Sequence, residues 1–306
     1  MTGEQSRPPR FSSSPDCDLA YSRGARARLV VGNRPVRQRV RGRFRGGRLT
    51  RAYHRYVALG DSSTEGLEDP APNGHHRGWA DRFAQHVARA QDAPLLYANL
   101  AVRGRNTRQL VEEQLEPALA MCPDLATVFS GTNDVIRRGF DLDAVMADLR
   151  RLHLALLGQG ATVLTLTMPD LSEVFPFAKR LSPRLEAFNA AVRELCAETG
   201  TLLLDVAHYP LAYDRRLWHE DRLHANAEGH RRIAEGLAHV LGLPGFDGAW
   251  SHPLPPDAPD TSLRQALDEV RWVAVYLAPW MLRRLRGRSS GDGITPKRPT
   301  LCPVDR

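Results

Sequence analysis

The sequence has 306 residues, enough for one large domain with a sizeable core, and a formal net charge of +7. Residues 1–51 contain thirteen arginines against three acidic residues, a balance of +10, so the rest of the chain carries −3. This distribution excludes a uniformly basic protein, and no run approaches the ~20 apolar residues of a membrane-spanning helix.

The basic segment, residues 1–51, is rich in Arg, Ser, Gly and Pro and has few large apolar residues. Such a composition buries too little surface to offset the entropy of ordering the chain, so we predict a disordered tail. An arginine-rich arm can also bind RNA or another acidic surface non-specifically. A non-catalytic nucleic-acid-binding module is therefore an alternative function, although we expect no specific nucleic-acid partner.

The sequence shows no signal for export or for metal and redox chemistry. Its first residues lack the apolar core of a secretory signal peptide. The cysteines have no paired spacing typical of zinc or of a redox couple; they are Cys17, Cys122, Cys196 and Cys302. We therefore expect a cytoplasmic protein without a metal or another cofactor.

A strand–helix alternation begins near residue 53. Short apolar runs predict five strands, at 56–59, 95–100, 125–129, 161–168 and 202–204. Helical spacing predicts helices at 79–90, 107–121, 142–157, 183–199 and 228–241, with Pro117 unfavourable late in the second of them. This order predicts an α/β fold for residues 52–245, a three-layer α/β/α sandwich around a five-stranded parallel sheet with a flavodoxin-like strand order.

The chain after residue 245 has a different composition. Residues 246–306 begin with a proline-rich linker and continue with an apolar stripe at helical spacing, followed by a basic tail. The stripe consists of Leu263, Leu267, Val270, Ala274 and Leu277, and the basic residues are Arg283, Arg284, Arg286 and Arg288. Two interpretations stay open: an amphipathic helix that packs on the domain, or one that makes weak contact with an anionic membrane surface.

Four short blocks follow or border the predicted strand ends. They are Gly60-Asp61-Ser62-Ser63, Asn99-Leu100-Ala101-Val102-Arg103-Gly104, Gly131-Thr132-Asn133-Asp134 and Asp221-Arg222-Leu223-His224. In open parallel sheets, ligands bind beyond the carboxyl ends of the strands, so we expect these blocks to meet at one edge. Together they supply a nucleophile, a base with a carboxylate, and hydrogen-bond donors, a complete set for acyl transfer.

The chemistry of each residue type suggests its role. Serine is a weak nucleophile until a base accepts its proton, and Ser62 stands at a tight turn after the first strand. His224 is the candidate base, and Asp221, three residues earlier, can fix its tautomer and stabilise its cation. The backbone amides of Ser62 and Gly104 and the side-chain amide of Asn133 are candidate donors of an oxyanion hole.

The four blocks resemble those of the SGNH, or GDSL, hydrolases, named for the Ser, Gly, Asn and His of the same blocks. Ser62, Gly104, Asn133 and His224 match these positions, and Asp221 matches the aspartate of the last block. The resemblance spans about residues 54–243. It implies a three-layer α/β/α fold and a metal-free esterase, lipase, thioesterase or carbohydrate-esterase activity.

Two positions depart from the pattern of that family. Ser63 occupies a place that is often apolar, so its hydroxyl competes with that of Ser62 for assignment as the nucleophile. Arg103 stands where small residues are common. Arg103 and Arg105 either favour acidic substrates or are solvated, as charged side chains usually are.

The histidines of the last block do not have the spacing of a metal site. His219 and His224 are five residues apart in a predicted loop, whereas the histidines of zinc proteases lie four apart on a helix. We therefore expect no metal ligands among the site residues.

The loop after the fourth predicted strand is a candidate substrate-binding segment. Phe175 and Phe177 either line an acyl chain or belong to a small cluster that covers the core. The expected substrate is a small-molecule or lipid-derived ester, cleaved through an acyl-enzyme. Carbohydrate deacetylation and lysophospholipid hydrolysis by the same mechanism are alternatives, and the oligomeric state is left open.

Overall fold

The computed structural model describes residues 44–45, 48–49, 51–72, 74–170, 172, 179–256, 270–279, 282 and 290–306. The expectation of a disordered tail falls almost wholly outside these residues. The described part of that segment contains a short antiparallel pair of strands, β1 (Phe44–Arg45) and β2 (Arg48–Leu49). The expectations for Phe175, Phe177, Leu263, Leu267 and the arginines at 283–288 also lie outside the described residues.

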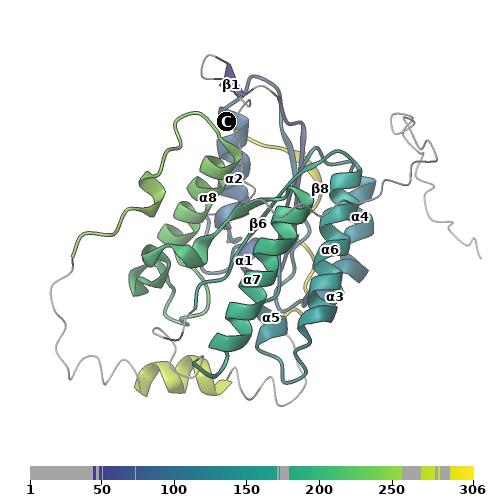
Figure 1. Ribbon diagram of the computed structural model, residues 1–306. Coiled ribbons are helices and arrows are strands. Elements are labelled where there is room, and N and C mark those ends of the chain that lie inside the picture. Colours follow the sequence, from purple (N-terminus) through teal and green to yellow (C-terminus); the bar gives the residue numbers. More distant parts are fainter. Residues whose placement is uncertain are drawn as a thin grey trace, which may run out of the picture. The chain divides into compact units, whose positions relative to one another are not determined.

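Six strands form one sheet in the order β7-β6-β5-β3-β4-β8 (Figure 1). Five of them are mutually parallel: β3 (Arg55–Gly60), β4 (Leu96–Asn99), β5 (Leu125–Phe129), β6 (Thr162–Leu166) and β7 (Leu202–Leu204). These are the five strands predicted from the sequence, and their flavodoxin-like order is confirmed.

The sixth strand, β8 (Arg298–Pro303), was not predicted. It pairs antiparallel with β4 at one edge of the sheet, where Leu96 lies opposite Pro303. Pro299 and Pro303 cannot donate ladder hydrogen bonds and therefore weaken the strand signal, but an edge position tolerates proline. The sheet is mainly parallel, with one antiparallel strand at its edge.

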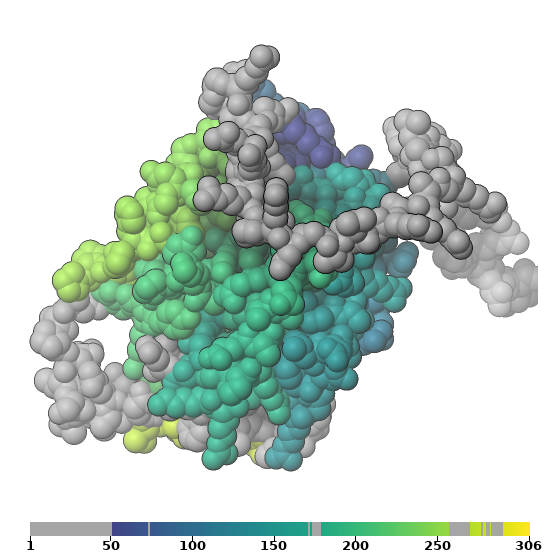
Figure 2. Space-filling model, in the orientation of Figure 1, coloured from purple at the N-terminus to yellow at the C-terminus, as the bar shows by residue number. Residues whose placement is uncertain are grey.

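Helices cover both faces of the sheet (Figure 1), and the alternation of side chains along β3 explains the two layers. Tyr56 and Ala58 belong to the core under α2 (Gly78–Arg89) and α8 (Ala227–Leu241). Val57 and Leu59 belong to the other core. It is covered by α3 (Thr107–Glu113), α4 (Leu115–Ala120), α6 (Leu142–Gly158) and α7 (Ser182–Thr199). Figure 2 shows α6 and α7 side by side on this outer face. The predicted three-layer sandwich is confirmed.

The single helix predicted at 107–121 is in fact two helices, α3 and α4, divided at Gln114. Pro117 has no N–H, and its ring collides with the carbonyl four residues earlier, that of Glu113, where α3 ends. Gln114 is buried at the break, and its side chain bonds both backbone groups of Gly60. Nε2 donates to the carbonyl oxygen and Oε1 accepts from the N–H, each at 2.9 Å. The helix break thereby supports the end of β3.

The chain beyond the proline-rich linker contains a helix at residues 270–279, called here the C-terminal helix. Its middle, Val273–Leu277, is π-helical. Val270 of the predicted apolar stripe is 70% exposed, whereas Trp272 is buried. Val270 and Ala274, the stripe residues whose burial the structure describes, are both exposed. None of the helices that the structure describes has the length and apolar character needed to cross a bilayer.

Candidate active site

The turn after β3 presents Ser62 as the first residue of a short helix, α1 (Ser62–Glu65). Gly60 allows the tight turn, because a Cβ there would lie 2.1 Å from Thr64 Oγ1 and 2.7 Å from the carbonyl oxygen of Phe129. Ser62 therefore stands at the carboxyl end of a central strand, where open parallel sheets bind their ligands.

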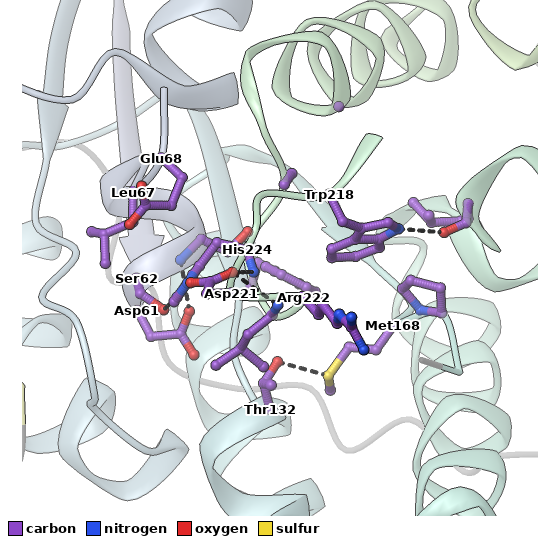
Figure 3. A pocket seen from close by; sticks show the side chains of 18 of the residues that line it. Asp61, Ser62, Leu67, Glu68, Thr132, Met168, Trp218, Asp221, Arg222 and His224 are labelled. Atoms are coloured by element: carbon purple, nitrogen blue, oxygen red, sulfur yellow. Dashed lines mark hydrogen bonds and ion pairs between the residues drawn. The ribbon is translucent and has the colours of Figure 1, made fainter. Parts of the chain in front are cut away.

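The loop before α8 brings Asp221 and His224 to Ser62 (Figure 3). His224 Nε2 lies 2.8 Å from Ser62 Oγ, and His224 Nδ1 lies 2.6 Å from Asp221 Oδ2. Oδ1 of Asp221 accepts hydrogen bonds from the N–H groups of Leu223 and His224, at 3.0 and 3.1 Å. The three side chains singled out in the sequence form one hydrogen-bonded series of hydroxyl, imidazole and carboxylate.

Burial and charge act in opposite directions on this histidine–aspartate pair. Burial raises the pKa of Asp221, but the hydrogen bond and charge of His224 outweigh it and lower that pKa to about 2. Burial lowers the pKa of His224, and the hydrogen bond and charge of Asp221 raise it above its ordinary value. Asp221 is therefore ionised at neutral pH and can stabilise an imidazolium at His224.

The neighbouring hydroxyl, that of Ser63, has a different environment. The indole Nε1 of Trp79, a fully buried residue of α2, donates to Ser63 Oγ at 3.3 Å. The two hydroxyls that compete for assignment in the sequence thus have different partners. In the described part of the chain, His224 is bonded to that of Ser62 and not to that of Ser63.

The three candidate oxyanion donors border the same cavity, but they differ in availability. Among the residues that the structure describes, the backbone N–H groups of Ser62 and Gly104 have no hydrogen-bond acceptor. Asn133 Nδ2 donates to Asp61 Oδ2 and to the carbonyl oxygen of Arg105, each at 3.0 Å. Both hydrogens of the Asn133 amide are therefore already engaged, which the sequence did not predict.

Asp61 is a site residue to which the sequence reasoning gave no role. It is 2% exposed, and burial raises its pKa to about 6. Its carboxylate caps α1 by accepting from the N–H of Ser63 at 3.2 Å, and it orients the amide of Asn133. The only signal for this role is its position next to Ser62, which does not reveal the contact with a block 72 residues later.

The two arginines near the site are paired with glutamates. The guanidinium of Arg103 binds both carboxylate oxygens of Glu65, with Nε at 3.0 and 3.1 Å, and Glu65 is buried. Arg105 Nε lies 2.7 Å from Glu113 Oε2. Each arginine thus contacts a carboxylate of the chain itself, which corrects the interpretation of both as simply solvated side chains.

One group of side chains in the described residues has the composition of a metal site: Glu68, His219 and Asp221, whose ligand atoms lie within 4.8 Å of one another. His219 Nε2 is 3.2 Å from Glu68 Oε2, and His219 Nδ1 accepts from the backbone N–H of Asp221 at 3.2 Å. The two ring nitrogens thus serve different partners. This arrangement favours a hydrogen-bonded support of the loop over a shared metal ligand set.

A cavity of about 1090 Å³ opens beside Ser62. Figure 3 shows Leu67 and Glu68 on one side of His224 and Trp218 with Met168 on the other. Further walls are apolar, formed by Val135, Ile136, Leu181, Leu185, Leu211, Leu217, Ile233 and Trp250. These residues come from distant parts of the chain, so no sequence spacing could have identified them as one pocket.

A protein family matches more than half of the chain. Residues 58–232 match the model of the GDSL-like Lipase/Acylhydrolase family, and this range includes all four blocks. No curated protein matches the chain.

Several solved structures are similar to this chain. A catalytic mutant of Axe2, an acetylxylan esterase from Geobacillus stearothermophilus, is 18% identical with a TM-score of 0.52, over 66% of this chain and 97% of that one. LAE5, an alpha/beta hydrolase enzyme from the metagenome of Lake Arreo, Spain, is 21% identical with a TM-score of 0.52, over 63% and 96%. TesA is 19% identical with a TM-score of 0.51, over 62% and 98%. At these identities the likeness shows the fold alone.

Proposed function

The chain belongs to the GDSL-like lipase/acylhydrolase family of carboxylic ester hydrolases, and from this premise we propose that it cleaves esters through an acyl-enzyme on Ser62. The observation that carries the proposal is the series from Ser62 Oγ to His224 Nε2, at 2.8 Å, and from His224 Nδ1 to Asp221 Oδ2, at 2.6 Å. Catalytic mutants of the similar acetylxylan esterase offer support, because they replace a serine, a histidine and an aspartate three residues before that histidine.

The proposed reaction has two halves. His224 accepts the proton of Ser62 as Oγ attacks the ester carbonyl, and the resulting imidazolium then protonates the departing alkoxide. The acyl group stays on Ser62 until a water, deprotonated by the same imidazole, attacks it and releases the acid. Asp221 remains ionised throughout, since its pKa is about 2, and stabilises the imidazolium in both halves.

The oxyanion formed in each half requires hydrogen-bond donors. The backbone N–H groups of Ser62 and Gly104 are available without rearrangement, given that neither has an acceptor among the described residues. Asn133 takes part by exchanging one of its two present acceptors, Asp61 or the Arg105 carbonyl, for the oxyanion. One such donor is worth about 3 kcal/mol of transition-state stabilisation.

The cavity suggests the class of ester. Its volume of about 1090 Å³ and its apolar walls suit an acyl group considerably longer than acetyl. A lipid-derived or other medium-chain ester is therefore the favoured substrate. The structural similarity to an acetylxylan esterase keeps carbohydrate deacetylation as the second candidate.

The test compares two neighbouring serines on p-nitrophenyl acetate and p-nitrophenyl octanoate. Ser62→Ala should remove hydrolysis of both esters down to the background rate, while Ser63→Ala, the matched control, should keep at least about half of the activity. A larger kcat/KM for octanoate than for acetate would support the long-chain assignment. Full activity in Ser62→Ala would overturn the mechanism, and a preference for acetyl esters of sugars would favour the second candidate.

A further inference from the structure

The C-terminal helix, residues 270–279, lies beyond the part of the chain matched by the family model, yet it contacts the loop that carries Asp221 and His224. Figure 1 shows this helix in yellow-green at the same end of the sheet as α5 (Thr132–Val135). Trp272 is 5% exposed, whereas Val270 and Val273 in the same helix are 70% and 42% exposed. Among the side chains of this helix whose burial the structure describes, Trp272 is the buried one.

The indole of Trp272 holds two consecutive residues of the loop. Its Nε1 donates to the backbone carbonyl oxygen of Asp221 at 3.2 Å. Its ring lies under the guanidinium of Arg222, whose central carbon is 4.5 Å from the ring centroid, which is the geometry of a cation–π contact. A third contact joins the same elements, because the hydroxyl of Tyr276 donates to Glu220 Oε2 at 3.0 Å.

The residue stacked on the indole has a backbone conformation that needs such support. Arg222 has a φ of 61°, in the left-handed region that residues with a Cβ rarely adopt, and it is 3% exposed. This turn places the N–H groups of Leu223 and His224 on Asp221 Oδ1 and so aims Oδ2 at the imidazole. If the turn relaxed, the carboxylate would lose its orientation toward His224.

We propose that Trp272 is a positioning residue of the active site, which keeps Asp221 directed at His224 by holding the Asp221 carbonyl and the Arg222 side chain. The inference rests on the proposed function, since it assigns the C-terminal helix a part in the same reaction. Trp272 also lines the cavity, but the role proposed here runs through the loop: its loss lowers the fraction of molecules in which the imidazole is correctly oriented and polarised.

The test uses graded variants of the full chain. Trp272→Phe keeps an aromatic ring under Arg222 but removes the N–H donor, and should lower kcat by about 3- to 10-fold. Trp272→Ala removes both contacts and should lower kcat by about 30-fold or more; because Trp272 also lines the cavity, a change in KM accompanies it, and kcat and the pH profile are the measurements that report positioning. The acid limb of the kcat/KM profile should also move to lower pH by about 0.5 unit, because Asp221 raises the pKa of His224 less effectively.

Val273→Ala is the matched control, since Val273 lies next to Trp272 and is outside the cavity lining. Val273→Ala should leave kcat unchanged within about twofold and should leave the pH profile unchanged.

If Trp272→Ala does not fold, Trp272→Phe and Arg222→Lys carry the test. Arg222→Lys replaces the planar cation stacked on the indole with a point charge. Wild-type kcat and pH profile in both of these variants would overturn the inference. Ser62→Ala separates the two levels: if it stays active, the proposed function fails, whereas if only the Trp272 variants behave as wild type, the positioning role fails alone.

Discussion

The imidazole of His224 is central to the proposed chemistry, because it bonds Ser62 on one side and Asp221 on the other. Sequence order selected all three as candidates, since they stand in the first and last of four short blocks with a recognisable order, and the structure brings them together. Spacing was insufficient for Asn133, whose amide is engaged by Asp61 and by the Arg105 carbonyl. Such contacts depend on distances across strand ends that sequence does not encode locally.

The pH dependence of the reaction follows from the pKa of His224. As the proposed general base, His224 must be neutral, so we expect activity to be lost as pH falls through this pKa, which is shifted upward. In the kcat/KM profile, we expect the acid limb to have its midpoint above the ordinary histidine value of about 6.5. In Asp221→Asn that midpoint should move to lower pH, and kcat should fall by about 10⁴-fold because the imidazole tautomer is no longer fixed. An acid limb that does not move in Asp221→Asn would contradict the assignment of the pair.

The role proposed for Asn133 makes a separate prediction. Asn133→Ala should lower kcat by about 10²- to 10³-fold, corresponding to about 3–4 kcal/mol, with little change in KM. Thr132→Ala is a suitable neighbour for comparison, since its hydroxyl bonds the sulfur of Met168 and no proposed step uses it. Equal losses in the two variants would indicate damage to the loop rather than loss of an oxyanion donor.

At the scale of elements, the position of Pro117 explains why one predicted helix is divided into α3 and α4. Pro117 removes a hydrogen bond to Glu113 and so places the break three or four residues upstream of the proline itself. The sequence could not predict that the residue at the break, Gln114, supports the end of β3, because its side chain bonds Gly60, 54 residues earlier in the chain.

Gln114 should consequently matter for stability. Gln114→Ala removes the side-chain acceptor of the buried Gly60 N–H and leaves the Gly60 carbonyl with the N–H of Val102, at 3.4 Å, so we expect a loss of about 2 kcal/mol in the free energy of unfolding. Urea unfolding measures this change, with Glu112→Ala, an exposed residue of α3, as a control expected within about 0.5 kcal/mol of the wild type. A loss below about 1 kcal/mol in Gln114→Ala would show that water replaces the side chain at no great cost.

At the scale of the whole molecule, residues 291–303 are joined to α2, β4 and the loop after β4. β8 adds to the edge of the sheet beside β4, and a Cβ at Gly291 would lie 2.0 Å from the carbonyl oxygen of Arg103. Lys297 Nζ lies 2.8 Å from Asp81 Oδ1 and donates to the carbonyl oxygen of Arg77 at 2.7 Å. The sequence separated residues 246–306 from the domain by composition, and composition does not reveal that the last strand completes the sheet.

A variant of Lys297, which contacts α2, tests whether the C-terminal strand stabilises the sheet. Lys297→Met keeps the length of the side chain but leaves Asp81 and two backbone carbonyls without their cation, so we expect a destabilisation of about 2 kcal/mol. In thermal unfolding this corresponds to a Tm lower by about 5 °C for a domain of this size. Thr300→Ala, at an exposed position of β8, should shift Tm by no more than about 1 °C. If both variants melt like the wild type, the C-terminal strand contributes little to the stability of the sheet.

The central claim is that Ser62 carries the acyl group, and covalent labelling tests it most directly. A fluorophosphonate reagent reacts only with an activated serine, because the attacking oxygen must be deprotonated as it displaces fluoride. We predict one phosphonyl group per chain, located on Ser62 by mass spectrometry of the digested protein, absent in Ser62→Ala and formed far more slowly in His224→Ala. An adduct on Ser63 or on another serine, or labelling at an unchanged rate in Ser62→Ala, would contradict the account.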